Sequence, residues 1–362
     1  MTPRDRFIAA LECRPAEGLV PHFELVFFLT MEAFGRIHPS QRHYRQWRQM
    51  SDRERDLHRR DIADLYVQTA QRFGHSAIFF HQPGGWEDDY DGETRATLEI
   101  IRQISGDEYL LMIHGDTTLG IPDGDGMVRL SEAIADEPQK VKDNQARRVE
   151  RALQNAEAYR KHGALDCFAL CSDYCFNTGP FLSPAMFDEF VTPYLARLTA
   201  GYRELGFYVI KHTDGNIMPI LESLLSTKPH ALHSLDPQGS VDIAQVRRRV
   251  GNSLCLCGNV NCALMDTGTD AQVLESAQYA LRHGLAGDGY IFSTSNCIYT
   301  GMCLDRYELI LDVWRREGAR QKENGKRKKS GPAQAGTGHK ESTPQLATRN
   351  SPPTRRGHNP LR

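Results

Sequence analysis

The chain has 362 residues, of which 40% are hydrophobic and 25% are charged, an ordinary globular composition. Its formal net charge of −2 hides a split, because residues 318–362 hold 11 basic and two acidic side chains while residues 1–317 hold 33 and 44. An acidic body argues against nucleic-acid binding, and no run of about 18 apolar residues is present to span a membrane.

The N-terminal segment, Met1–Arg6, lacks the apolar core of a secretion signal, so the sequence predicts a cytoplasmic protein. In that compartment the nine cysteines are expected to be free thiols or metal ligands rather than a disulfide framework.

Apolar runs alternate with amphipathic stretches in the first half of the chain. The hydrophobic spacing predicts helices at 4–11, 52–73 and 97–104, with one or two more within 127–165. Strands are expected at 21–28, 76–80, 109–113 and 166–170. Residues 29–51 are expected to be irregular.

The same alternation continues in the second half. Ser183 as N-cap and Pro184 as first helical residue open a helix that is expected to run towards Leu205. Four strands are expected at 207–210, 231–235, 254–256 and 289–292. Helices are expected at 217–225, 242–250, 270–283 and 304–316.

Eight strands alternating with helices predict a single (β/α)8 TIM barrel over residues 1–317. An open, doubly wound sheet is the structural alternative, but no glycine-rich dinucleotide or phosphate loop follows the first strand. Residues 318–362 are rich in charge and small polar residues and contain almost no large apolar ones. They are therefore predicted to be a disordered basic tail.

Side chains that can bind a metal follow the predicted strands of the second half. His212 and Asp214 end one strand, Asp236 ends the next, and Cys257 and Cys297 follow the last two. The C-terminal ends of barrel strands meet at one mouth, so these five side chains are expected to converge there. Nitrogen, carboxylate and thiolate are the ligands of zinc, and three of them beside an open position form a catalytic site. A single buried cysteine is more often a core residue, so the prediction depends on the whole set.

Other side chains near predicted strand ends are candidates for a role in the same site. Glu24, His81 and Asp173 would position a substrate or move protons, although each alone is at least as often a structural polar residue. The candidates for substrate contact are Trp86, Tyr90, Tyr174, Asn216 and Asn259. Core packing is the default explanation for the aromatic residues, and turn geometry alone would explain the asparagines. Cys262 and Cys303 are reserve ligands, and Cys167, Cys171 and Cys175 are expected to be core cysteines.

Several of these motifs resemble the uroporphyrinogen decarboxylase superfamily. They are Arg4-Asp5-Arg6-Phe7 with Pro21, Gly179-Pro180-Phe181-Leu182-Ser183-Pro184, Phe190 to Pro193-Tyr194, His212-Thr213-Asp214-Gly215-Asn216, Cys257-Gly258-Asn259-Val260-Asn261 and Gly289-Tyr290-Ile291-Phe292-Ser293. The resemblance covers about residues 2–316 and is strongest from 170 to 300. It implies a single barrel with one of two activities, decarboxylation of uroporphyrinogen or zinc-dependent methyl transfer to or from corrinoid proteins.

The first strand favours the methyltransferase branch of that superfamily. Its decarboxylases begin with Met-Arg-Gln-Ala-Gly-Arg-Tyr, whose arginines hold porphyrin carboxylates, whereas residues 21–28 here contain no arginine. The methyltransferases often carry His-x-Cys and a late cysteine. Cys297 matches the late cysteine, but Asp214 stands at the first cysteine position. The ligand set is left open: either Asp214 binds the metal, or Cys257 supplies a thiolate while Asp214 or Asp236 supplies the carboxylate.

The resemblance therefore implies an enzyme that moves a methyl group between a small O-methyl compound and a corrinoid, with a methoxylated aromatic as the favoured donor. Zinc would polarise the ether oxygen. The corrinoid is expected on a separate partner protein, because the chain has no Asp-x-His-x-x-Gly cobalamin-binding motif. The alternatives are a metal-free decarboxylase that depends on Asp173 and a non-catalytic ligand-binding barrel. The direction of transfer and the oligomeric state stay open, with a homodimer as one option.

Overall fold

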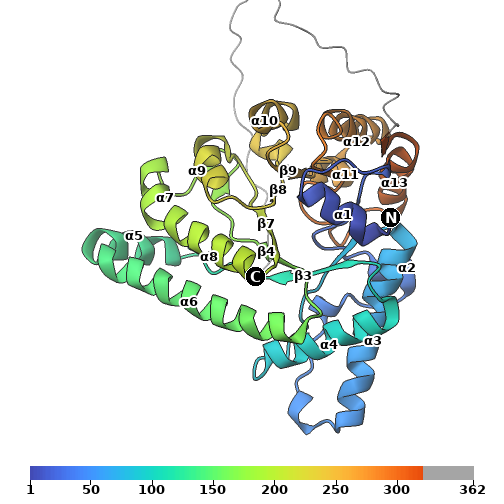
Figure 1. Ribbon diagram of the computed structural model, residues 1–362, viewed down its shortest axis with the longest axis horizontal. Helices are drawn as coiled ribbons and strands as arrows, with labels where there is room; N and C mark the ends of the chain where they lie inside the picture. The colour runs from blue at the N-terminus through green and yellow to red at the C-terminus, as the bar shows by residue number, and fades with distance from the viewer. Residues whose placement is uncertain (321–362) are drawn as a thin grey trace, which may run out of the picture. The chain divides into compact units, whose positions relative to one another are not determined.

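A curled parallel sheet of seven strands, in the order β10-β9-β8-β7-β4-β3-β2, forms the centre of the computed structural model (Figure 1). The structure describes residues 1–320, so most of the predicted basic tail lies outside the described residues. The strands of this sheet are β2 (Ala77–Phe79), β3 (Leu110–His114), β4 (Cys167–Leu170), β7 (Tyr208–His212), β8 (Ala231–His233), β9 (Cys255–Cys257) and β10 (Tyr290–Ile291). Every neighbouring pair is parallel, as strand–helix alternation predicts.

The expected first strand of the barrel, residues 21–28, is not a regular strand. It reaches the β10 side of the sheet through isolated bridges from His22 to Phe292 and from Phe27 to Ile298. It reaches the β2 side where the Ser76 amide donates to the His22 carbonyl at 2.6 Å. The seven strands therefore make an α/β fold of TIM type, and an irregular segment joins its two edges where an eighth strand was expected.

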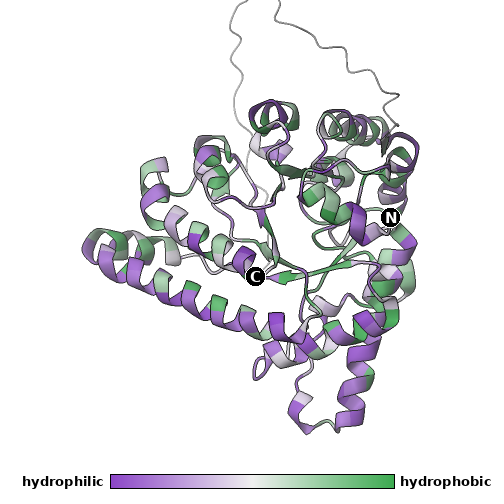
Figure 2. Cartoon of the chain, in the orientation of Figure 1, coloured by the Kyte–Doolittle hydropathy of each residue, from purple (hydrophilic) through white to green (hydrophobic). Residues whose placement is uncertain are grey.

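Helices pack on the outside of the sheet, with their polar faces outwards (Figures 1 and 2). They are α1 (Pro3–Leu11), α2 (Thr30–Phe34), α3 (Asp52–Phe73), α4 (Tyr90–Ser105), α5 (Gly126–Asp136), α6 (Pro138–His162), α7 (Pro184–Phe190), α8 (Thr192–Glu204), α9 (Leu221–Ser226), α10 (Ile243–Val250), α11 (Cys262–Thr267), α12 (Asp270–Gly284) and α13 (Leu304–Glu317). Short 3-10 turns lie at η1 (Pro39–Gln41), η2 (Trp47–Gln49), η3 (Met218–Ile220) and η4 (Pro237–Gly239). Two small antiparallel pairs join β1 (Gly18–Leu19) to β11 (Ala319–Arg320) and β5 (Cys175–Phe176) to β6 (Gly179–Pro180).

Three predicted boundaries are wrong for identifiable reasons. The helix expected from Ser183 to Leu205 is two helices that are separated at Val191. Pro193 has no amide hydrogen, so it cannot make the helical hydrogen bond to the carbonyl four residues earlier. The helix expected at 97–104 begins at Tyr90, because the Asp89 side chain caps it by accepting the Gly92 amide at 2.9 Å. Residues 319–320 pair with β1, so they belong to the body of the protein rather than to the tail.

Alternation along the strands divides the core into two layers. On β3, for example, Leu110 and Met112 face the inside of the curled sheet, while Leu111 and Ile113 pack under the outer helices. Helix α1 packs its Phe7 into the inner layer and so covers one end of the sheet. The other end, where the strands have their C-termini, carries the polar side chains. In the described part of the chain, no helix combines the length and the apolar character needed to cross a bilayer.

Candidate metal centre

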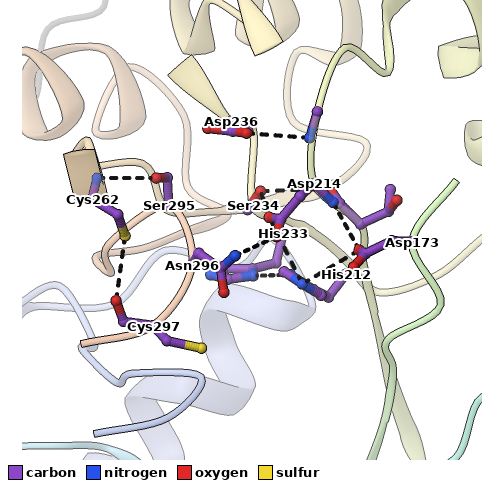
Figure 3. A network of polar contacts seen from close by, with 12 residues as sticks. Asp173, His212, Asp214, His233, Ser234, Asp236, Cys262, Ser295, Asn296 and Cys297 are labelled. Carbon is purple, nitrogen blue, oxygen red and sulfur yellow. Dashed lines mark hydrogen bonds and ion pairs between the residues drawn. The ribbon is translucent and has the colours of Figure 1, made fainter. Parts of the chain in front are cut away.

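Three side chains that can bind a metal converge at the C-terminal end of the sheet. In residues 1–320 they are the one group of three or more such residues, Asp173, His212 and Asp214, whose ligand atoms all lie within 4.8 Å of one another (Figure 3). His212 Nε2 is 3.9 Å from Asp173 Oδ1 and 3.8 Å from Asp214 Oδ1. A small shift of these side chains would bring all three ligand atoms onto one cation, and we call Asp173, His212 and Asp214 the metal group.

Strand pairing explains why these residues meet. β4 and β7 are parallel neighbours, with Leu170 opposite Lys211, so the residues that follow both strands leave the sheet at one place. His212 ends β7, while Asp173 lies three residues beyond β4. The Asp214 amide donates to Asp173 Oδ1 at 3.1 Å and holds the two loops together.

Asp214 is held as an acceptor on both of its oxygens. Ser234 donates to Oδ1 at 2.7 Å, and the Asn296 amide donates to Oδ2. Burial raises the pKa of the Asp214 carboxyl to about 7; the Ser234 hydrogen bond opposes the rise and the nearby Asp173 carboxylate adds to it. A bound cation would remove this electrostatic cost.

His212 presents one ring nitrogen to these carboxylates. The residue is 4% exposed, and burial lowers the pKa of its imidazole well below the usual value, so the ring is neutral. Its Nδ1 lies 2.7 Å from Nδ1 of His233, which leaves Nε2 on the side of the two aspartates. A neutral imidazole and two carboxylates are ligands that zinc accepts, and the Asp173 side chain is 48% exposed, which leaves one side of the group open.

Asp236, Cys257 and Cys297 are not part of this group. Asp236 is 6% exposed and shapes the backbone: its Oδ2 accepts the Gly215 amide at 3.2 Å and its Oδ1 accepts the Gln238 amide at 2.9 Å. It therefore fixes the turn that follows Asp214.

The cysteines lie deeper than the sequence predicted. Cys257 is fully buried in the inner layer of the sheet, where burial raises the pKa of its thiol well above the usual value. Cys297 is 9% exposed, and burial likewise raises its thiol pKa, with smaller contributions from charges that include Asp214. Cys297 directly follows Asn296, whose amide donates to Asp214 Oδ2, so its backbone is one residue away from a hydrogen-bond partner of that carboxylate (Figure 3). The reserve ligand Cys262 donates to the Cys297 carbonyl at 3.5 Å, and Cys303 is exposed.

Of the predicted catalytic residues, only Asp173 belongs to the metal group. Glu24 is 4% exposed, and its Oε2 accepts the Thr294 hydroxyl at 2.5 Å. Burial raises its pKa to about 8. Its Oε1 has no hydrogen-bond partner, and the residue lines a cavity of about 30 Å³. His81 is half-buried; its Nδ1 donates to the Phe79 carbonyl at 3.1 Å.

Most of the residues predicted to contact the substrate are buried or hydrogen-bonded to the backbone. Trp86 and Tyr174 are 1% and 0% exposed, so neither offers a free face to a ligand in this structure. Tyr90 is 39% exposed at the start of α4. The Asn216 side chain accepts the Met218 amide at 3.2 Å, and the Asn259 side chain donates to the Leu235 carbonyl at 2.8 Å. Asn216 thus stabilises its own turn, whereas Asn259 joins the loop after β9 to the loop after β8.

Sequence reasoning missed three residues that hold the metal group in place: His233, Ser234 and Asn296. Each lies near the end of a predicted strand, close to Asp236 or Cys297, which were the predicted ligands in those segments. His233 carried the clearest signal, because a histidine inside a fully buried strand needs a hydrogen-bonding partner.

Comparison with known proteins gives the family. The family model for uroporphyrinogen decarboxylase (URO-D) matches residues 123–316, more than half of the chain. The chain belongs to the uroporphyrinogen decarboxylase family. The matched region contains Asp173, His212 and Asp214, so the metal group lies within the part that this family shares. Comparison with curated proteins finds no match.

Comparison with solved structures supports the fold through one methyltransferase, and it also finds a weaker likeness to a synthase. A methyltransferase from Methanosarcina mazei aligns over 88% of this chain and 99% of its own, with a TM-score of 0.60 and 15% identity. A dihydrodipicolinate synthase from Agrobacterium tumefaciens aligns over 87% of this chain and 78% of its own, with a TM-score of 0.40 and 12% identity. At these identities the likeness to the methyltransferase is one of fold.

Gly215, which follows Asp214, tests how tightly the site is held. Its φ is +77°, and an added Cβ would lie 2.4 Å from the Cys175 carbonyl oxygen. We expect Gly215→Ala to lower the free energy of unfolding by about 2–3 kcal/mol, from backbone strain plus this contact. Gly206→Ala is the matched control, because Gly206 has a φ of +88° but no atom within 4 Å of the added Cβ. It should cost only about 1 kcal/mol. Equal losses in urea unfolding would show that the loop beside Asp214 adapts freely.

Proposed function

We propose that this protein is a zinc-dependent methyltransferase that moves a methyl group between a small O-methyl compound and a corrinoid carried by a separate protein. The observation that carries the proposal is the group of Asp173, His212 and Asp214 at the end of the sheet where TIM-type enzymes build active sites. Membership of the uroporphyrinogen decarboxylase family and the fold of the methyltransferase from Methanosarcina mazei support it.

Each side chain in and around the metal group would have its own role. His212 and Asp214 would hold zinc, with Asp173 as a third ligand from the neighbouring loop. The chemistry that zinc supplies when bound is polarisation of the ether oxygen, which offsets the charge that develops as the methyl group leaves. Asn296 and Ser234 would keep both oxygens of Asp214 in place. Cys297 would be the fourth candidate ligand, reached by adjustment of its loop.

The donor class follows from the difficulty of the reaction. An alkoxide or phenoxide is a poor leaving group, so an ether needs a Lewis acid more than an activated methyl donor does. A methoxylated aromatic is therefore the substrate to test first, with a corrinoid protein as methyl acceptor. A cytoplasmic location and a homodimer remain predictions from the sequence.

Metal content is the first measurement. We expect purified wild-type protein, reconstituted under reducing conditions, to hold about one zinc per chain, and His212→Gln to hold much less. Cys257→Ser is the control, because Cys257 lies inside the sheet and outside the metal group. Cys297→Ser tests whether Cys297 is the fourth ligand, because a loss of zinc in this variant would show that it binds the metal.

Turnover then distinguishes the rival functions. Demethylation of a methoxylated aromatic in the presence of a Co(I) corrinoid protein, lost in His212→Gln, is the expected result. A wild-type protein that binds no zinc and decarboxylates a porphyrinogen would replace the proposal with the metal-free decarboxylase. Tight ligand binding without turnover would point to the non-catalytic barrel.

A further inference from the structure

Two histidine rings meet behind the metal group. Nδ1 of His212, at the end of β7, lies 2.7 Å from Nδ1 of His233, at the end of the neighbouring β8. The two residues are 4% and 0% exposed, so the contact is shielded from water. At this distance one nitrogen must carry a hydrogen and the other must accept it, because two lone pairs would repel. The contact alone does not say which ring is the donor.

The Thr294 carbonyl decides the direction. Nε2 of His233 lies 3.3 Å from this oxygen, which can only accept a hydrogen bond. Nε2 of His233 therefore carries the hydrogen. A neutral imidazole has one ring hydrogen, so Nδ1 of His233 is bare and accepts from Nδ1 of His212. The hydrogen of His212 is thus on Nδ1, and its Nε2 has only a lone pair.

We infer that His233 is a positioning residue that fixes His212 in the tautomer whose Nε2 lone pair faces Asp173 and Asp214. The bare Nε2 of His212 then faces two carboxylate oxygens, Oδ1 of Asp173 at 3.9 Å and Oδ1 of Asp214 at 3.8 Å, and no histidine hydrogen lies between them. Such an arrangement favours a cation at the centre. The inference rests on the proposed function for its purpose, but the tautomer itself is a property of the metal-free protein.

The chain of contacts continues to Glu24. Oγ of Ser293 lies 3.4 Å from Nε2 of His233 and 3.5 Å from Oε2 of Glu24. The same Oε2 accepts the Thr294 hydroxyl at 2.5 Å and the Thr294 amide at 3.3 Å. Glu24 therefore anchors the two residues that contact His233. We assign it the same kind of positioning role, exerted through the Thr294 carbonyl.

Imidazole nitrogen resonances test the tautomer directly. Full-length protein labelled with ¹⁵N-histidine and stripped of metal should show a pyrrole-type Nδ1 and a pyridine-type Nε2 for His212, and the opposite pattern for His233. His212→Gln and His233→Gln assign the signals. A spectrum in which His212 carries its hydrogen on Nε2 would overturn the inference.

Zinc affinity tests the role. His233→Phe removes the acceptor and should weaken zinc binding by about 10–100-fold, the usual cost of losing a partner of a metal-bound histidine. His233→Gln retains an oxygen that can accept from Nδ1 of His212, so it should recover part of the loss. His283→Gln, in α12, is the control and should bind zinc as wild type does.

The outcomes separate the inference from the proposed function. Unchanged zinc affinity in folded His233→Phe would refute the positioning role while leaving the zinc site intact. A wild-type protein that shows the expected tautomers but binds no zinc would refute the proposed function and leave the tautomer assignment standing. Glu24→Gln extends the test: its amide oxygen can replace Oε2 as acceptor, so it should keep the tautomers, whereas Glu24→Leu should disturb them.

Discussion

Replacing Asp214 with asparagine is expected to stabilise the metal-free protein at pH 8 while lowering zinc affinity by about 100-fold or more, beyond the usual cost of losing an outer partner. The cause of both effects is one buried charge. Burial raises the pKa of the Asp214 carboxyl to about 7, compared with an ordinary value of 3.8. The protonated Asp214 carboxyl is therefore the form that the folded protein favours. Its contribution to the free energy of unfolding is fully present below about pH 3.8 and is lost as the pH rises through 7.

Asparagine keeps the shape but never ionises. Its oxygen can accept from Ser234, and the Asn296 amide can turn by 180° to accept its NH₂ group, so both contacts survive. At pH 8 the variant should be up to about 4 kcal/mol more stable than metal-free wild type, because the pKa of Asp214 is raised from 3.8 to about 7 and one pKa unit corresponds to about 1.4 kcal/mol. At pH 4 the two proteins should be nearly equal.

Urea unfolding of the metal-free proteins at pH 4, 6 and 8, with isothermal zinc titration at pH 8, measures both effects. A variant that is less stable at every pH would show that the Asp214 carboxylate is favourably held without a cation. In that case the three residues would be an ordinary polar cluster. Stabilisation together with lost zinc binding is the expected trade between stability and function.

The sheet could be predicted from the sequence because each strand is a short apolar run that ends at a polar residue. That signal depends only on neighbours along the chain, and it predicted strand ends at residues 210, 235 and 256, within two residues of the observed ends at His212, His233 and Cys257. The irregular segment at 21–28 could not be predicted in the same way. Its conformation depends on what lies beside it, and residues 292–298 offer it only isolated bridges.

The site was only partly predictable, for a related reason. Periodicity shows that Asp214 and Asp236 both follow strands, but it does not show that Asp236 uses both oxygens on backbone amides. Cys257 ends its strand with its side chain inside the sheet rather than at the mouth, a difference of one residue in register. Asp173, expected to act on substrate or protons, lies beside the predicted ligands because β4 and β7 are adjacent.

A buried ion pair beneath the site should have the largest effect on stability. Lys211 is 0% exposed, and its Nζ donates to Asp116 Oδ2 at 2.8 Å, to the Leu170 carbonyl at 3.0 Å and to the Ser172 carbonyl at 2.9 Å. Burial alone would raise the pKa of Asp116, but the Lys211 ammonium holds it at about 2. Lys211→Met would leave that carboxylate buried without its partner, which typically costs about 3–5 kcal/mol.

The double variant Lys211→Met/Asp116→Asn separates charge from structure. It removes both charges, so it should recover much of the stability lost in Lys211→Met in urea unfolding at pH 7. It should not recover zinc affinity to the same extent, because Lys211 also holds the Ser172 carbonyl beside Asp173 and directly precedes His212. If the double variant recovered both equally, the ion pair would support the fold alone. Recovery of stability without recovery of zinc binding would show that Lys211 also fixes the distance between the loops that follow β4 and β7.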